Sequence, residues 1–213
     1  MPFIDRRDAA LRLAKALAQY HGQAPLLLAI PRGAVPMAKI IADELGGELD
    51  VVLVRKLAAP FNPEFAIGSI DETGWAYIAD CANQAGANSA YIEAEKIRQM
   101  KTMCQRREQY TPLRPPIDPA GRIVIVVDDG LATGSTMIAA LHALRAKRPA
   151  KLICAVPVAP PDTLEKIRPL ADEVVCLEAP QHFQAVGQFY QDFRQVEDAE
   201  VIEILRQCGR AME

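Results

Sequence analysis

Residues Val124–Thr136 read VIVVDDGLATGST, and this stretch decides the fold class. Together with Ile123 it begins as a run of five β-branched residues without polar alternation, which is typical of a strand buried on both faces. Two aspartates end the run, and a loop of small residues leads into a helical pattern that begins near Thr136. A buried strand that passes through a short loop into a helix is the repeating unit of a parallel α/β sheet.

The rest of the chain repeats this alternation of apolar runs and helically spaced segments. The predicted strands cover residues 26–30, 51–54, 123–127, 152–158 and 173–177. The predicted helices cover residues 6–20, 35–45, 89–109, 136–146, 162–168 and 198–208. This order favours a parallel sheet flanked by helices, and a chain of 213 residues suits a single domain over 1–213.

Two segments depart from the alternation. Residues 59–64 have the composition of a loop, and two short strands can pair across the turn Asp71–Gly74, so we predict a flexible hairpin loop over about Leu57–Ala79. Residues 180–213 are predicted to form a small C-terminal hood, whose aromatic side chains either stack on a planar ligand or anchor the hood to the core. In the long charged helix, the predicted inward positions are Ile97, Met100 and Cys104.

Composition limits the function classes. The net charge of −3 gives no indication of a nucleic-acid partner, and no apolar run approaches the length of a membrane span. The five cysteines are widely spaced and form no metal-ligand pattern, so we expect buried, reduced thiols. The N-terminus lacks the apolar core of a signal peptide, and we therefore expect a cytoplasmic protein.

Three segments with unusual chemistry follow predicted strands, namely Pro31–Ala34, Arg55–Ala59 and Asp128–Thr136. In parallel sheets, ligands bind beyond the carboxyl ends of the strands, so we expect the three segments to meet at one edge. Arg32 stands between proline and glycine after a buried strand, where a cation beside open backbone amides suits a pyrophosphate. Taken alone, Arg32 would be an ordinary turn residue, and Arg55-Lys56 a solvated strand end.

The segment Asp128–Thr136 combines two kinds of binding group. Adjacent carboxylates can each accept hydrogen bonds from neighbouring hydroxyls, and the small residues after them leave backbone amides open at a helix N-terminus, which favours a phosphate. Two carboxylates that bind neighbouring hydroxyls, beside backbone amides that bind a phosphate, fit a ribose 5-phosphate. The spacing of Gly130 and Gly134 excludes a Walker A loop, and no GxGxxG fingerprint is present. The alternative is an ordinary capped helix start.

On these residues, the chain resembles the type I phosphoribosyltransferases, and specifically bacterial members of unassigned base specificity, over about residues 20–195. The resemblance implies that Asp128 and Asp129 hold the ribose 2′- and 3′-hydroxyls of 5-phosphoribosyl-1-pyrophosphate (PRPP). It assigns the 5-phosphate to the small-residue loop and the pyrophosphate to the two basic segments. The implied phosphate and pyrophosphate residues are Arg32, Gly33, Arg55, Lys56, Ala132, Thr133, Gly134, Ser135 and Thr136.

The resemblance further implies a mechanism and partners. The catalytic residues would be Asp128, Asp129, Arg32 and Lys56, with the two aspartates reaching Mg²⁺ directly or through water. PRPP and a small-molecule base would be the substrates, in nucleotide salvage, with no nucleic-acid or membrane partner and with a homodimeric assembly. In the family, the peptide bond of the early basic loop is often cis, which would apply at Arg32, and the flexible loop closes over the site.

Some questions stay open at this stage. Ala132 stands where 6-oxopurine enzymes commonly have aspartate, which disfavours hypoxanthine or guanine without establishing adenine. Glu64, Asp71 and Glu72 are candidates for a general base in the flexible loop, although exposed loop carboxylates are rarely catalytic. The alternatives to an enzyme are a non-catalytic PRPP-binding regulatory protein and a scaffold with a vestigial site.

Overall fold

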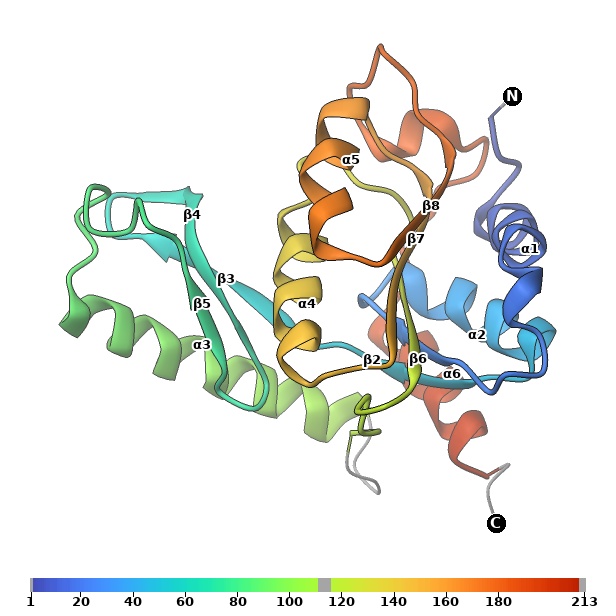
Figure 1. Cartoon of the computed structure of the whole chain (residues 1–213), viewed down its shortest axis with the longest axis horizontal. Helices are drawn as coiled ribbons and strands as arrows, with labels where there is room; N and C mark the ends of the chain where they lie inside the picture. Colours follow the sequence, from blue (N-terminus) through green and yellow to red (C-terminus); the bar gives the residue numbers. More distant parts are fainter. Residues whose placement is uncertain (1, 111–115, 211–213) are drawn as a thin grey trace.

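Five parallel strands form the central sheet, in the order β2-β1-β6-β7-β8 (Figure 1). The computed structural model describes residues 2–110 and 116–210, apart from the side chains of residues 63, 64, 209 and 210. The strands are β1 (Leu26–Ala29), β2 (Glu48–Val51), β6 (Ile123–Val127), β7 (Lys151–Val158) and β8 (Glu173–Glu178). The β-branched strand β6 lies in the middle of the sheet, which explains why its sequence has no polar face.

Helices cover both faces of this sheet, as predicted. In Figure 1, α1 (Arg6–Ala16) and α2 (Ala34–Leu45) lie on one side, and α4 (Ser135–Ala146) and α5 (Pro161–Ile167) lie on the other. Side chains alternate along β6, so Ile125 and Val127 join the core under α1 and α2, while Val124 and Val126 join the core under α4 and α5.

Local signals place the ends of the first two helices. The Asp5 carboxylate accepts a hydrogen bond from the Asp8 amide at 2.8 Å and caps α1. A short 3₁₀ turn continues the chain to Tyr20, so the predicted helix to about Tyr20 is interrupted after Ala16. Gly46 ends α2 in the left-handed conformation, with φ of 67°.

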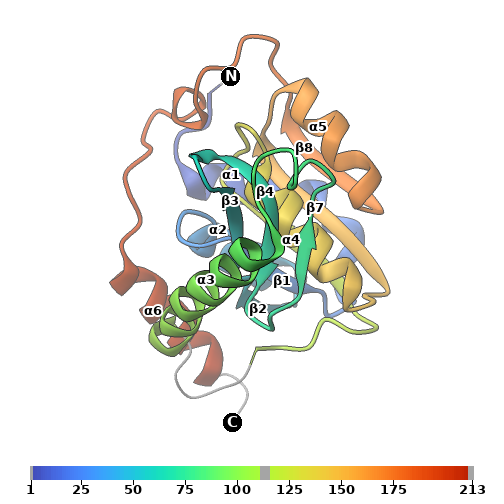
Figure 2. The same cartoon turned by 90° about the vertical axis from the view of Figure 1, so that its left-hand side faces the viewer.

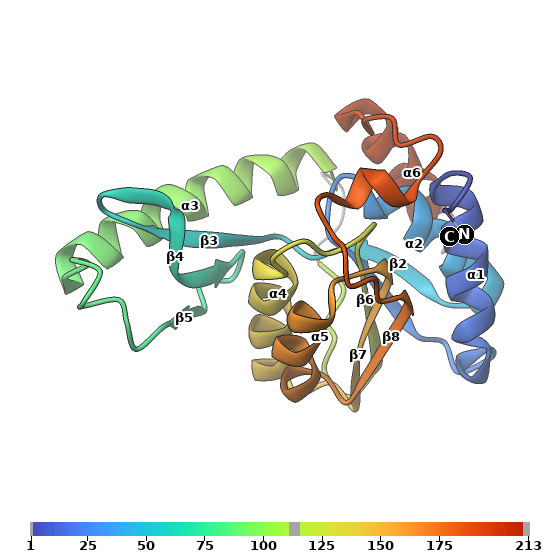
Figure 3. The same cartoon turned by 90° about the horizontal axis from the view of Figure 1, so that it is seen from above.

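A second, antiparallel sheet projects from the central body. It consists of β3 (Val54–Ala59), β4 (Asn62–Asp71) and β5 (Ala76–Ile78), and α3 (Ser89–Tyr110) packs on it. We call β3, β4, β5 and α3 together the side lobe. Figure 3 shows the lobe extending to the left of the main body, and in Figure 2 α3 runs across its front. The small sheet also contacts α4, where Tyr77 stacks on His142 at a centroid distance of 4.3 Å.

The predicted strand 51–54 is wrong, because it joins the end of one strand to the start of another. Pairing between β1 and β2 ends at Val51, and β3 begins at Val54 in the other sheet. The apolar run is continuous because its residues are buried where the two sheets meet. Arg55 and Lys56 therefore lie within β3 rather than in a loop that leaves the central sheet.

The predicted hairpin within Leu57–Ala79 is confirmed. Ile70 pairs with Ala76, and the Asp71 carboxylate accepts hydrogen bonds from the amides of Thr73 and Trp75 to close the turn. Strand β4 also pairs with β3, with register shifts on either side of Ala58. Its mobility remains a prediction.

Of the three predicted inward positions of α3, Met100 is partly buried against the core, whereas the prediction is wrong for Ile97 and Cys104. Ile97 is 71% exposed and Cys104 is exposed, whereas Glu95, Met103 and Tyr110 are buried. Hydrophobicity failed as a guide because α3 turns a largely polar face toward β3 and the cavity described below. The expectation of buried thiols is also wrong for Cys104; Cys154 alone of the five cysteines is fully buried.

Residues 180–193 lie beyond β8, and their rings pack mainly on one another and on the N-terminal segment. The ring centroids of Phe3 and Tyr190 lie 5.3 Å apart, and those of Tyr190 and Phe193 lie 4.8 Å apart. These rings anchor the segment. The chain then forms α6 (Asp198–Arg210), which packs against α2 and α3. Of the helices in the described residues, none is both long and apolar enough to cross a membrane.

Candidate active site at the carboxyl edge of the central sheet

The segments that follow β1 and β6 leave the sheet side by side. Parallel pairing sets Ala29 opposite Val127, and the Ile30 amide donates to the Val127 carbonyl at 3.0 Å. Beyond the strands, Gly33 lies directly against Asp129, since a Cβ on Gly33 would come within 2.0 Å of the Asp129 Oδ2 atom. The predicted meeting of these two loops is therefore confirmed. Gly33 is the residue type that permits their close approach.

Asp129 has two partners that the sequence did not reveal. Arg6, in the first turn of α1, donates from Nε and Nη2 to Asp129 Oδ2 at 2.9 and 2.7 Å. The Tyr190 hydroxyl donates to the Asp129 backbone carbonyl at 2.6 Å. Arg6 is itself held by the Arg194 carbonyl and lies over the Phe193 ring, 3.9 Å from its centroid. Both partners are distant in sequence from Asp129, so no local pattern points to them.

The two aspartates share a desolvated environment. Burial raises the pKa of Asp128 well above its ordinary value, and the neighbouring Asp129 charge raises it further. Burial also raises the pKa of Asp129, although the Arg6 guanidinium opposes this shift. Asp128 accepts a hydrogen bond from the Asp129 amide at 2.9 Å. The site thus holds closely spaced acceptors that favour hydrogen-bond donors such as hydroxyls.

The small-residue loop borders a hollow of about 220 Å³ in front of α4. Ala132, Thr133, Ser135 and Thr136 are exposed there, and the Thr133 and Ser135 hydroxyls lie 3.0 Å apart. Gly134 caps α4 with φ of 72°, and a Cβ on it would lie 2.7 Å from the Thr163 methyl group. Asp128 and Val186 line the same hollow. An anion bound here would meet the N-terminus of a 12-residue helix.

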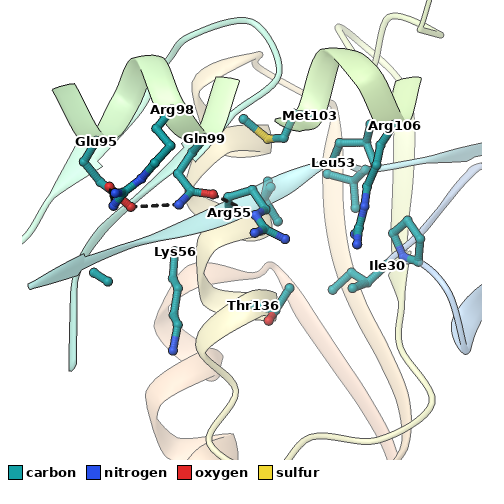
Figure 4. Close-up of a pocket in the computed structure, with 14 residues that line it drawn as sticks. Ile30, Leu53, Arg55, Lys56, Glu95, Arg98, Gln99, Met103, Arg106 and Thr136 are labelled. Carbon is teal, nitrogen blue, oxygen red and sulfur yellow. Dashed lines mark hydrogen bonds and ion pairs between the residues drawn. The ribbon is translucent and has the colours of Figure 1, made fainter. Parts of the chain in front are cut away.

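A larger cavity of about 560 Å³ lies between the side lobe and the edge of the central sheet (Figure 4). Pro31 and Thr136 line it from the two loops, and Arg55 and Lys56 line it from β3. Helix α3 adds polar residues that the sequence analysis missed, namely Glu95, Arg98, Gln99 and Arg106. The signal was the spacing of Glu95, Gln99 and Arg106, four and seven residues apart, which places them on one face of a helix.

Arg32 lies apart from this basic cavity. Its peptide bond with Pro31 is cis, as the resemblance implied. Its side chain lines a separate hollow of about 470 Å³ together with Gly33, Asp129 and Arg6. Arg32 Nη1 lies 3.8 Å from a Glu197 carboxylate oxygen and 3.7 Å from one of Asp198. The structure therefore brings Arg32 and Gly33 to Asp129, and brings Arg55 and Lys56 to Thr136.

The general-base candidates of the hairpin have structural partners instead. Glu72 pairs with Arg107, and the buried Asp71 closes its turn and lies 3.4 Å from Lys147 Nζ. The side chain of Glu64 lies outside the described residues. Within the part of the chain that the structure describes, no three His, Cys, Asp or Glu side chains group in a way suited to a metal ion. Asp128 and Asp129 supply two neighbouring carboxylates, which are hard oxygen donors of the kind that Mg²⁺ prefers.

Comparisons with known proteins show which family the chain belongs to. The family model for the phosphoribosyl transferase domain matches residues 5–194. The protein Rv0571c of Mycobacterium tuberculosis, whose name places it among phosphoribosyl transferases, is 42% identical over 98% of this chain. This chain spans 47% of that relative, about half its length. The crystal structure of TT1426 from Thermus thermophilus is 46% identical, covers 97% of this chain and 99% of its own, and superposes with a TM-score of 0.89. The chain therefore belongs to the phosphoribosyl transferase domain family, which is named for a glycosyl-transferring activity.

Proposed function

We propose that this chain transfers the 5-phosphoribosyl group of PRPP to a nitrogen acceptor, a nucleobase, and releases pyrophosphate. The observation that carries the proposal is the meeting of the acidic pair Asp128-Asp129, the loop Ala132–Thr136 and the Pro31–Gly33 turn at one edge of the sheet. PRPP needs acceptors for its ribose hydroxyls, a site for its 5-phosphate and cations for its pyrophosphate. Family membership supports this reaction class.

The side chains divide the binding work. Asp128 and Asp129 accept hydrogen bonds from the ribose hydroxyls, each contact to a charged group contributing about 1.5–3 kcal/mol. Backbone amides of Ala132–Thr136 and the dipole of α4 bind the 5-phosphate. Arg55 and Lys56 line the large cavity and Arg32 lines the separate hollow beside Asp129, and cations at these positions would stabilise the negative charge that grows on the leaving pyrophosphate as the bond to the anomeric carbon breaks.

Magnesium fits this arrangement as an ion carried by the substrate. The two aspartates offer oxygen ligands, but Asp129 Oδ2 is already bound by Arg6, so the protein supplies too few donors for a complete octahedral site. Asp128 and Asp129 would hold the ion directly or through water. When bound, the ion neutralises charge on the leaving group.

The acceptor would lie beside Val186, which lines both the phosphate hollow and the hollow around Arg32. Ala132 leaves no carboxylate at the position where 6-oxopurine enzymes have one, and its carbonyl is taken by the Thr163 hydroxyl at 2.7 Å. We therefore propose a base that does not depend on a carboxylate contact there. This would serve nucleotide salvage in the cytoplasm.

The test is pyrophosphate release from PRPP and magnesium with a panel of nucleobases. We expect release with at least one base, and none from the double variant Asp128→Asn, Asp129→Asn, which removes the charge of the two carboxylates. Calorimetry of PRPP binding should accompany the assay. Tight binding without release for any base would instead favour a PRPP-binding regulatory protein, and absence of binding would leave a scaffold with a vestigial site.

A further inference from the structure

Two arginines, one from β3 and one from α3, border the large cavity. Arg55 extends from β3 and Arg106 from α3, and Figure 4 shows both guanidinium groups bordering the space above Thr136. Among the residues that the structure describes, neither arginine forms a salt bridge with a carboxylate. Lys56 extends from β3 away from α3, so Arg106 is the cation that faces Arg55 across this space.

The two charges oppose each other. Burial lowers the pKa of Arg55, and the positive charge of Arg106 lowers it further. Such a repulsion between neighbouring cations is relieved when an anion lies between them. Guanidinium groups bind phosphate oxygens through paired N–H donors, and a cavity of about 560 Å³ is large enough for a diphosphate.

A chain of three residues fixes the orientation of Arg55. Glu95 is 2% exposed, and its Oε1 accepts a hydrogen bond from Gln99 Nε2 at 2.8 Å. Gln99 Oε1 in turn accepts from Arg55 Nε at 2.9 Å. Because Gln99 must donate to Glu95, its carbonyl oxygen faces Arg55. The Arg55 Nε is thereby occupied, and its two terminal nitrogens remain directed at the cavity.

We propose that Arg55 and Arg106 form a two-arginine clamp for the pyrophosphate end of PRPP, and that Gln99 and Glu95 are positioning residues for Arg55. The assignment rests on the proposed function and extends it to helix α3, which the sequence did not associate with the site. Clamping would also join the side lobe to the edge of the central sheet, because the two arginines belong to the lobe while Pro31 follows β1 and Thr136 lies in the first turn of α4.

The test measures binding of two separate probes by calorimetry, inorganic pyrophosphate with magnesium and ribose 5-phosphate. Arg106→Gln should weaken pyrophosphate binding about tenfold or more, the loss expected for a charge-assisted contact, and leave ribose 5-phosphate binding unchanged. Lys101→Gln is the matched control, since Lys101 is an exposed cation on the same helix outside the cavity. Arg106→Lys keeps the charge without the paired donors and should give an intermediate loss. Arg106 is exposed, so these variants should fold.

The positioning role has its own readout. Gln99→Met should weaken pyrophosphate binding in the otherwise native protein but have no further effect in an Arg55→Gln background, because its action passes through Arg55. Additive losses in that double-mutant cycle would overturn the positioning role. They would mean that Gln99 acts on the lobe as a whole.

The outcomes separate this inference from the proposed function. If the native protein binds both probes and Arg106→Gln leaves pyrophosphate affinity unchanged, the clamp is wrong while PRPP binding stands. If only Arg32→Gln weakens pyrophosphate binding, the leaving group occupies the hollow around Arg32 instead. If Lys101→Gln weakens binding as much as Arg106→Gln, the effect is general electrostatics and the clamp is again wrong. If the native protein binds neither probe, the proposed function itself fails.

Discussion

Arg6 donates two hydrogen bonds to one carboxylate oxygen of Asp129, and this ion pair joins the first turn of α1 to the acidic pair at the end of β6. Both side chains are largely buried, with 13% and 16% exposure. Asp129 Oδ2 is therefore occupied, and its other oxygen remains for a ligand. The Arg6 guanidinium also opposes the increase that burial causes in the pKa of Asp129.

Replacing Arg6 should make PRPP binding sensitive to pH. In Arg6→Gln, the pKa of Asp129 rises. As the pH is lowered, the Asp129 carboxylate is therefore protonated at a higher pH than in the native protein, and the ionised acceptor is lost. Calorimetric PRPP affinity should therefore decline from a higher pH, and Arg6→Lys should partly restore the native profile. The control is Arg12→Gln on the same helix, which removes a pair with Asp8 and a contact with the Phe3 ring while leaving the Arg6–Asp129 pair in place. An unshifted profile in Arg6→Gln would show that Arg6 has no electrostatic role.

A methyl group at Gly33 should impair ribose binding without unfolding the protein. Gly33 has φ of −57° and ψ of −32°, which alanine adopts without strain. The added Cβ would, however, overlap Asp129 Oδ2 at 2.0 Å, so the carboxylate must move from its partner Arg6. We expect Gly33→Ala to melt within a few degrees of the native protein, and to lose PRPP affinity about tenfold or more, if one charge-assisted contact is lost. Native affinity would show that Asp129 does not grip the ribose.

Asp128→Asn should stabilise the protein at neutral pH while removing its function. The folded pKa of Asp128 is raised, so the folded state binds the proton more tightly than the unfolded state, and stability falls as pH rises through this interval. Asparagine removes this penalty. Each kcal/mol regained raises the melting temperature by about 2–4 °C in a chain of this size. The gain should be largest above the folded pKa of Asp128 and should vanish as pH falls to the unfolded value of about 3.9, and a gain independent of pH would contradict the ionisation argument.

Arg107→Met should unfold or detach the side lobe more readily. Arg107 donates to the buried Asp50 at the end of β2, at 2.9 Å, and to Glu72 in the β4–β5 turn. Its loss breaks a pair whose carboxylate, on Asp50, is 1% exposed, and breaking such a buried pair costs about 3–5 kcal/mol. Arg145→Met is the control, because its exposed pair with Asp172 contributes at most about 1 kcal/mol. Urea unfolding measures the free energy of unfolding of both variants. Equal losses would mean that the buried pairs of Arg107 contribute no more than an exposed surface pair.

Ligand binding should protect the side lobe from hydrogen exchange. The lobe contacts the cavity through β3 and α3, and a site that admits a polyanion must open and then exclude water. We expect amides of Leu57–Ala79 to exchange faster in the free protein than with PRPP and magnesium bound. Amides of β6 should exchange slowly in both states and serve as the internal reference. Equal protection of Leu57–Ala79 with and without ligand would make it a fixed structural sheet.

The sequence by itself determined the central sheet and the loop that follows its middle strand. Residues Ile123–Val127 could only form a strand covered on both faces, since they carry no polar side. The acidic pair and the glycines of Asp128–Thr136 fixed the chemistry of the loop, because strand end, turn and helix start are all local. Local signals were sufficient wherever the interacting groups are neighbours in the chain.

Only the tertiary structure decided what surrounds that loop. Arg6 reaches Asp129 across 123 residues, and the polar face of α3 joins the site only because α3 packs on β3. The continuous apolar run at Val51–Val54 concealed a change of sheet, since residues buried between two sheets look like one buried strand. The periodicity of apolar side chains indicates which residues are buried, but it does not indicate which element of the fold buries them. Residues that are buried against a distant element, or turned toward a ligand, therefore become visible only once the chain is folded.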